Sequence, residues 1–413
     1  MIFMEVLEVV YFGYTFIAFY FLFVYILTYT QNRKRIYEWI KPKKNYGLSI
    51  VVPCYNEANS IGRNIDSIMN SDYPGLKKLF VVDDCSKDNS YQIIKKYAKK
   101  YKGKVVALQT PKNTGRAAGA KNYGAKFVKT ELIGFSDADS FPKKDAISKM
   151  VGYFNNEKVG AVTSRVLVEN RKKKLSQLQA MEYKVIAFTR KILGFIDSIY
   201  VTNGPLSIYR KKAYDQAGGF SMKNLTEDIE ITWHIVSKGW KVEMAIPAKV
   251  YTVVPEKLGE WFHQRIRWNV GGIQTVMTYK NKFMQCGMLG LFIIPYFIFS
   301  WLLGITGLFF LAYRLFNYIM VRFLVAKYSV ASEVALVTVR DLKINPSILF
   351  LFGLVLFSLS ITYTVLSLLH SREKEYSGHK IRDIFIYSFF YLLVYPPLLI
   401  MSFFRYFQGK NTW

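Results

Sequence analysis

The sequence predicts an α/β domain with a largely parallel sheet, inserted between membrane helices, with one helix before the domain and about three after it. Three observations lead to this prediction. Half of the 413 residues are hydrophobic (51%), yet the net charge is +27. The charged residues are concentrated between residues 31 and 287, and long apolar segments lie outside these limits. Within the charged region, short apolar runs alternate with amphipathic stretches, which is typical of alternating strands and helices.

Composition excludes two classes of protein. Aromatic residues make up 17% of the chain, and with so much apolar sequence a disordered protein is excluded. The chain has three cysteines, Cys54, Cys85 and Cys286, which excludes a disulfide-rich scaffold. Three cysteines cannot all pair, so we expect reduced thiols in a domain that faces the cytosol.

Residues 7–30 form the first predicted membrane helix. The segment carries no charge after Glu8, and it is long enough to cross a bilayer. It lacks a basic leader and a small-residue cleavage site, so we interpret it as a retained helix rather than a signal peptide. Basic residues follow from Arg33 to Lys44, and by the positive-inside rule they place the next part of the chain in the cytoplasm.

Three further membrane helices are predicted after the charged region, at residues 288–313, 347–370 and 384–404. Pro396 and Pro397 should kink the last of them. Residues 315–345 are too charged to span comfortably, so we expect an extracytoplasmic or interfacial segment there. With this arrangement both ends of the chain lie outside the cell.

The predicted α/β domain occupies residues 45–255. Apolar runs that end in polar residues lie within 47–57, 76–90, 104–110 and 131–141, and helical stretches lie within 60–71, 91–101 and 117–128. Ligands of such sheets bind outside the carboxyl ends of the strands. Polar clusters at residues 55–57, 83–84 and 137–139 fall at these ends, which makes them candidate site residues.

Asp137 and Asp139 end the fourth apolar run with one residue between them. Alternate residues at a strand end can direct two carboxylates to one side, which suits a hard cation such as Mg²⁺ or Mn²⁺. Such a cation would bridge to phosphate oxygens and neutralise a leaving diphosphate. The same tripeptide also occurs on ordinary surfaces, and its place after an apolar run favours the metal site.

Two other acidic clusters each allow two interpretations. Asp84 could accept hydrogen bonds from a base or a ribose, or Asp83 and Asp84 could simply cap the next helix. Glu227 and Asp228 precede a stretch with apolar residues on one helical face, which places Asp228 at or near a helix N-terminus. Asp228 is then either a general base for an acceptor hydroxyl or a carboxylate stabilised by the helix dipole.

Residues 256–287 are predicted to form interface helices that carry the most specific motif, QRIRW. In a helix Gln264, Arg267 and Trp268 occupy positions i, i+3 and i+4, with Trp261 on the same side. That face offers an amide, a guanidinium for phosphate and an aromatic platform for a sugar ring. The other interpretation is a helix at the membrane surface, with tryptophan at headgroup level and arginine snorkelling.

The motifs YNE, VVDDCSKD, DAD, TED and QRIRW follow one another across residues 50–272. Their order resembles that of membrane-embedded family-2 glycosyltransferases, whose QxxRW subgroup includes cellulose, hyaluronan, chitooligosaccharide and poly-N-acetylglucosamine synthases. The stretches TEDIEITW and VPEKLGEWFHQRIRWNVGG are especially similar to the last of these enzymes. The resemblance implies a cytosolic, Rossmann-like α/β domain of the GT-A fold.

The resemblance also implies a role for each matching residue. Asp228 would be the base, beside Glu227. Asp139 would be the direct metal ligand in the donor motif, with Asp137. The nucleotide-sugar donor would contact Pro53, Tyr55, Glu57, Asp84, Arg116, Asp137, Gln264, Arg265 and Arg267, and the acceptor would contact Trp268, Asn203 and Gly204. Mg²⁺ or Mn²⁺ would be the cofactor.

Three departures from the family pattern bear on these roles. Arg116 stands where the family usually has lysine, and Cys85 replaces a usual glycine. The segment VTNGPLSIYR, which contains Asn203, replaces the more typical Ser-Gly or Cys-Gly acceptor loop. Asn203 could therefore change the choice of acceptor.

The expected function is inverting transfer of a sugar, from UDP-GlcNAc or UDP-glucose, to a growing poly- or oligosaccharide. The alternative is transfer of a single sugar to a lipid. Nucleic-acid binding, suggested by the charge of +27, is not expected because no recognition module accompanies the basic residues. We expect a multi-pass plasma-membrane protein with a cytoplasmic catalytic domain, in contact with membrane lipid. An export partner and a second copy of the chain are further candidate partners.

Overall fold

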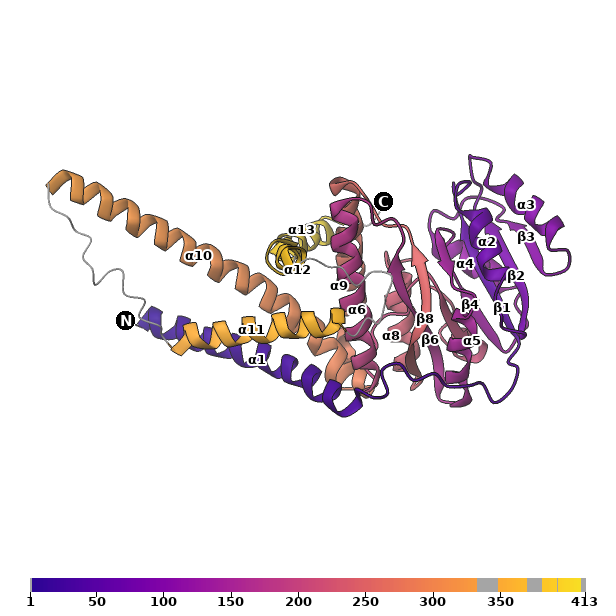
Figure 1. Cartoon of the computed structure of the whole chain (residues 1–413), viewed down its shortest axis with the longest axis horizontal. Helices are drawn as coiled ribbons and strands as arrows, with labels where there is room; N and C mark the ends of the chain where they lie inside the picture. Colours follow the sequence, from indigo (N-terminus) through magenta and orange to yellow (C-terminus); the bar gives the residue numbers. More distant parts are fainter. Residues whose placement is uncertain (1, 333–347, 370–380, 392, 410–413) are drawn as a thin grey trace.

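The computed structural model describes residues 2–332, 348–369, 381–391 and 393–409. In this part of the chain eight strands form one sheet in the order β3-β2-β1-β4-β7-β6-β8-β5. Figure 1 shows the sheet and its covering helices at one end of the molecule and the long apolar helices at the other. The predicted α/β domain between membrane-type helices is confirmed.

The first half of the sheet is parallel, as predicted. Its strands are β1 (Leu48–Cys54), β2 (Leu76–Asp83), β3 (Val105–Gln109) and β4 (Leu132–Phe135). Side chains of β1 alternate between two cores. Val51 packs with α4 (Ala117–Ala125) on one face, and Ile50 packs with α2 (Ile61–Met69) and α3 (Ser90–Lys100) on the other.

The second half of the sheet is mixed rather than parallel, which the sequence did not predict. It contains β5 (Ser140–Pro142), β6 (Val159–Val168), β7 (Ser207–Arg210) and β8 (Lys241–Thr252). β7 runs antiparallel to both β4 and β6, and β5 runs antiparallel to β8, while β6 and β8 are parallel. The helices in this half are α5 (Ala146–Val151), α6 (Lys174–Gly194), α7 (Lys211–Gln216) and α8 (Glu227–Ser237).

Two helices are long and apolar enough to cross a membrane, over residues Val9–Asn32 and Leu289–Ala331 of the described chain. The first belongs to α1 (Ile2–Asn32), which contains the predicted helix 7–30. The second joins a π-helical turn, η3 (Leu289–Ile293), to α10 (Ile294–Ser332). The helix therefore continues past the predicted end at residue 313, to Ser332, and the point where it leaves the membrane stays a prediction. The apolar face of the helix continues into the segment 315–345 despite its charges, and residues 333–345 lie outside the described part.

The last two predicted membrane helices are also refined. Residues 347–370 correspond to α11 (Ile348–Leu369). Residues 384–404 do not form one helix but α12 (Ile381–Ile386), the π-helical turn η6 (Tyr387–Tyr391) and α13 (Tyr395–Phe407). α13 begins at Tyr395, so Pro396 lies in its first turn. A proline is tolerated there because its missing N–H would have no helical partner at that position. The number of membrane crossings and the side on which each end lies stay predictions.

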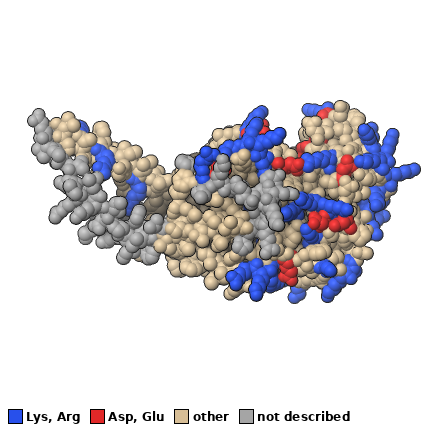
Figure 2. Space-filling model, viewed as in Figure 1, with Lys and Arg blue, Asp and Glu red and all other residues tan. Residues whose placement is uncertain are grey.

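Charge is distributed as the sequence indicated. Figure 2 shows lysine and arginine gathered over the sheet domain, while the outer part of α10 is mostly uncharged on the face in view. Between the two ends lies α9 (Leu258–Tyr279), which packs against α13, and α6, which packs against α11. These contacts bring the C-terminal helices close to the polar edge of the sheet.

Candidate active site

A cavity of about 820 Å³ opens at the carboxyl ends of β1, β2 and β4. Fourteen of the fifteen predicted site residues line it, although they come from distant parts of the chain. They are Pro53, Tyr55, Glu57, Asp84, Arg116, Asp137, Asp139, Asn203, Gly204, Glu227, Asp228, Gln264, Arg267 and Trp268. The fifteenth, Arg265, does not line it.

Asp84 anchors the loop that follows β3. Its carboxylate accepts hydrogen bonds from the Thr110 hydroxyl (2.7 Å) and from the backbone N–H and hydroxyl of Thr114 (3.0 and 2.8 Å). This places Arg116 at the cavity wall, where it also donates to the Asn224 carbonyl. Cys85, the residue after Asp84, has φ +58°, a left-handed conformation that glycine adopts more readily than other residues.

Asp137 lies against the backbone of Gly204. A Cβ atom at Gly204 would come 2.2 Å from Asp137 Oδ2, so no other residue fits without displacing this carboxylate. The backbone N–H of Asp137 also donates to the Gly204 carbonyl (3.2 Å). The lack of a side chain at Gly204 therefore leaves the space that the Asp137 carboxylate occupies, and the contact of Gly204 with the acceptor stays a prediction.

Asp139 carries an unusually basic carboxyl group. Burial, together with the carboxylates of Asp137 and Glu57, raises its pKa to about 7. The Asp137 and Glu57 carboxylates are thus near enough to make ionisation of Asp139 less favourable. No group of three or more His, Cys, Asp or Glu side chains in the described residues is arranged to enclose a metal ion by itself. The carboxylates of Asp137 and Asp139, completed by ligands from outside the protein such as water or phosphate oxygens, are a suitable donor set for Mg²⁺ or Mn²⁺.

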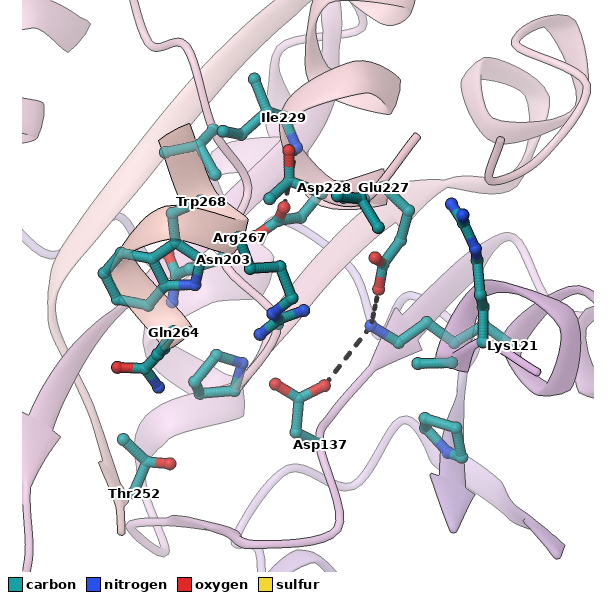
Figure 3. Close-up of a pocket in the computed structure, with 18 of the residues that line it drawn as sticks. Lys121, Asp137, Asn203, Glu227, Asp228, Ile229, Thr252, Gln264, Arg267 and Trp268 are labelled. Atoms are coloured by element: carbon teal, nitrogen blue, oxygen red, sulfur yellow. Dashed lines mark hydrogen bonds and ion pairs between the residues drawn. The ribbon is translucent and has the colours of Figure 1, made fainter. Parts of the chain in front are cut away.

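Lys121 is a central residue of the site that sequence reasoning missed. Its ammonium group is buried and lies 2.9 Å from Glu227 Oε1 and 3.4 Å from Asp137 Oδ1 (Figure 3). Burial opposes its charge, but the two carboxylates outweigh this and raise its pKa. Lys121 lies on α4 amid small residues, and no sequence pattern separates it from the many other lysines.

Asp228 is the second residue of α8, as predicted. Its Oδ1 accepts the backbone N–H of Ile229 (2.9 Å), and its side chain is half-buried in the cavity wall. Burial and the neighbouring Glu227 raise the pKa of Asp228 to about 6, against the opposing charge of Lys121. Burial also disfavours the charge of Glu227, but Lys121 outweighs it and lowers the pKa of Glu227. Glu227 is therefore held as a carboxylate by Lys121, whereas Asp228 is the more basic of the two side chains.

One face of α9 supplies Gln264, Arg267 and Trp268 to the cavity, as their spacing predicted (Figure 3). The predictions for Arg265 and Trp261 need correction. Arg265 is buried on another face and pairs with Glu182 on α6, so its side chain does not reach the cavity. Trp261 is buried beside it and donates to the Tyr391 hydroxyl (2.9 Å). Both contacts are long-range, and helical spacing alone could not reveal them.

Part of the cavity wall is aromatic, which sequence reasoning also missed. Tyr183, Tyr200, Phe297 and Trp301 line it, the last two from α10. Asn203 joins this wall to the sheet, because its Oδ1 accepts hydrogen bonds from Arg190 (2.7 Å) and from the Thr163 hydroxyl. The cavity is therefore polar where the strands end and apolar where α10 borders it.

Comparison with known proteins agrees with this geometry. The profile of the family described as "Glycosyltransferase like family 2" matches residues 45–271, more than half of the chain. A poly-β-1,6-N-acetyl-D-glucosamine synthase of Staphylococcus epidermidis is 28% identical over 252 residues, 60% of each protein. The synthase of the same name from Staphylococcus aureus is 26% identical over 279 residues, 67% of this chain and 66% of the relative. The match to the first of these relatives thus spans about 60% of its length.

A solved structure shares the fold over nearly the whole chain. The mannosyltransferase PcManGT of Pyrobaculum calidifontis, solved with GDP-Man and Mn²⁺, superposes with a TM-score of 0.61 at 17% identity. The superposition covers 96% of this chain and 99% of that one, so the likeness includes helices outside the sheet domain. With the family profile over residues 45–271 and the strand-end cavity that this region builds, the chain belongs to glycosyltransferase family 2.

Proposed function

We propose that this chain is an inverting glycosyltransferase that transfers a sugar, first of all GlcNAc from UDP-GlcNAc, to a growing poly- or oligosaccharide. One observation carries the proposal: Asp228 shares a single cavity with the Asp137 and Asp139 carboxylates and with Arg267 and Trp268. A base, a site for an anionic leaving group and an aromatic platform are what displacement of a nucleoside diphosphate by a sugar hydroxyl requires. The names of the staphylococcal relatives support GlcNAc as the sugar.

In this proposal Asp228 accepts the proton of the acceptor hydroxyl as that oxygen attacks the sugar carbon. The raised pKa suits this role, because a more basic carboxylate takes the proton more readily. Lys121 holds Glu227 and Asp137 in place, while Arg267 and Arg116 stand at the cavity wall to bind the departing diphosphate. Trp268 and Tyr183 offer ring faces to the acceptor sugar.

Asp139 and Asp137 would hold a divalent cation, Mg²⁺ or Mn²⁺, with phosphate oxygens and water completing its ligands. The fit rests on Asp139, whose pKa is raised by burial and by the neighbouring carboxylates of Asp137 and Glu57. A bound cation would supply charge neutralisation for the diphosphate. The Mn²⁺ in the solved mannosyltransferase complex supports this assignment.

We place the chain in a membrane through α1 and α10, with the sheet domain in the cytoplasm. Both helices are long and apolar enough to cross a bilayer. The basic residues that follow α1, from Arg33 to Lys44, favour the cytoplasmic side. Because Phe297 and Trp301 of α10 line the cavity, the acceptor site adjoins a membrane helix.

The function is tested by mass spectrometry of the products. We would incubate the purified full chain, in lipid nanodiscs, with UDP-GlcNAc, UDP-glucose or GDP-mannose, each with Mg²⁺, with Mn²⁺ or with excess EDTA. The expected result is a ladder of GlcNAc oligomers from UDP-GlcNAc that appears with metal and disappears with EDTA. A single sugar on a lipid without a ladder would replace the polymer proposal by glycolipid synthesis, and no transfer from any donor would overturn both.

The pH dependence tests the base. An aspartate with a pKa near 6 is deprotonated only above that pH, so kcat/KM should fall about tenfold per pH unit below about pH 6 and level off above it. Saturating metal keeps Asp139 deprotonated and removes it from the profile. The measurement is kcat/KM for the acceptor between about pH 5 and 8 at constant ionic strength. Activity that stays constant down to pH 5 would contradict the assignment of Asp228.

A further inference from the structure

A buried ion pair lies directly behind the aromatic platform of the cavity. Glu182 of α6 and Arg265 of α9 meet with Arg265 Nη2 2.5 Å from Glu182 Oε2, and their side chains are 6% and 1% exposed. Burial disfavours the charge of Arg265, but the Glu182 carboxylate and the neighbouring tyrosines outweigh this and raise the pKa of Arg265. Two charges removed from water in this way are stable only while each keeps its partner.

Two tyrosines from the C-terminal part of the chain complete this cluster. The Tyr391 hydroxyl donates to Glu182 Oε2 (2.7 Å), and the Tyr395 hydroxyl donates to Glu182 Oε1. Arg265 Nε in turn donates to the Tyr395 hydroxyl (3.0 Å). Glu182 therefore accepts three hydrogen bonds: one from Arg265 of α9, one from Tyr391 at the end of η6 and one from Tyr395 at the start of α13.

The Arg265 guanidinium also contacts two residues that line the cavity, Trp268 and Gln264. Its guanidinium carbon lies 4.1 Å from the centre of the Trp268 ring, and its Nη1 donates to Gln264 Oε1 (2.7 Å). Tyr183, next to Glu182 in the chain, has its ring centre 6.5 Å from that of Trp268. Gln264, Trp268 and Tyr183 all line the cavity, whereas Glu182 and Arg265 do not.

We propose that Glu182 is a positioning residue for the acceptor. By holding the Arg265 guanidinium, it positions the Trp268 ring over which that group lies and the Gln264 amide that accepts its hydrogen bond. Through Tyr391 and Tyr395 the same carboxylate ties the acceptor wall to the C-terminal helices. This inference rests on the proposed function for its substrate, since it assigns the acceptor sugar to the wall that Glu182 holds.

Kinetics of Glu182→Gln test the proposal. Glutamine keeps the size of the side chain but removes its charge and replaces one of the two acceptor oxygens by an NH₂ donor. The donors of Arg265, Tyr391 and Tyr395 then compete for one remaining oxygen, so the guanidinium of Arg265 is held less firmly. The KM for a GlcNAc oligomer should rise about tenfold while the Kd of UDP measured by calorimetry stays unchanged. This expectation gives Gln264 to the acceptor together with Trp268, whereas the family resemblance implied a donor contact for Gln264. Tyr395→Phe should change the same constant in the same direction by less. An unchanged acceptor KM in Glu182→Gln would overturn the proposal.

A double variant separates positioning from stability. Glu182→Leu with Arg265→Leu removes both buried charges, so it should melt at a higher temperature than Glu182→Leu alone. Its acceptor KM should nevertheless stay raised, because Trp268 and Gln264 still lack Arg265. If restored stability also restored the acceptor KM, Glu182 would be merely structural and the proposal would be wrong.

Tyr363→Phe is the matched control, because the Tyr363 hydroxyl joins α11 to Thr189 of α6 (2.9 Å) outside the cavity. It should leave the acceptor KM unchanged. Hydrogen–deuterium exchange of α9 provides a measurement without substrate: Glu182→Gln should speed exchange around Gln264 and Trp268, and Tyr363→Phe should not. A wild-type chain without transferase activity would refute the proposed function, and the exchange result would still decide whether Glu182 holds α9. Equal exchange in the wild type and Glu182→Gln would overturn that role.

Discussion

Asp228→Asn is expected to reduce sugar transfer by about 10²–10⁴-fold, the usual contribution of a general base. Asparagine has nearly the same shape as aspartate and can still accept the hydrogen bond from the backbone N–H of Ile229. It cannot take a proton from the acceptor hydroxyl. The structure of the site should therefore persist, and UDP binding measured by calorimetry should stay within about twofold of the wild type, a free-energy change under about 0.5 kcal/mol.

The control for this variant lies on the same helix. Glu230 is also buried, but its carboxylate faces α9 and accepts a hydrogen bond from the Tyr279 hydroxyl (2.9 Å) rather than lining the cavity. Glu230→Gln can keep that bond and should transfer sugar at nearly the wild-type rate. If Asp228→Asn transferred sugar at the wild-type rate, Asp228 would not be the base, however tightly the variant binds the donor.

Lys121→Met is expected to impair both stability and turnover. Methionine fills the space of the lysine stem but leaves the Glu227 and Asp137 carboxylates without the ammonium group between them. Breaking a buried ion pair in this way costs about 3–5 kcal/mol, which corresponds to a drop of about 10 °C in the unfolding midpoint. Turnover should fall about 10²-fold at pH 7, because the two carboxylates lose their fixed positions.

The same substitution should move the acid limb of the pH profile upward. Lys121 opposes the rise in the pKa of Asp228, so its loss leaves the base protonated at a higher pH. Lys126→Met, an exposed position at the end of the same helix, should change neither the midpoint nor the profile. Lys121→Met combined with Glu227→Gln should recover part of the lost stability. If Lys121→Met alone kept the melting curve and the pH profile of the wild type, the ion pair between Lys121 and Glu227 would contribute neither to stability nor to catalysis.

Much of the site could be predicted from the sequence because its residues stand at the ends of locally recognisable elements. Asp84 and Asp137 follow strands whose apolar runs are evident, and the positions of Gln264, Arg267 and Trp268 follow from helical spacing alone. Strand ends in a parallel sheet meet at one edge, so these residues were expected to converge. Arg265 shows the limit of this reasoning. It sits within the same motif, but its direction depends on Glu182, which is 83 residues away.

The sequence by itself therefore determined the α/β domain, the long apolar helices beside it and the residues at the strand ends, since periodicity and strand polarity are local properties. Only the tertiary structure decided that the second half of the sheet is mixed, that α10 continues to Ser332 and that Lys121 pairs with Glu227. Lys121 and Glu227 are 106 residues apart. A buried charge selects its partner by proximity in the folded core, and proximity between such distant residues has no trace in local sequence patterns.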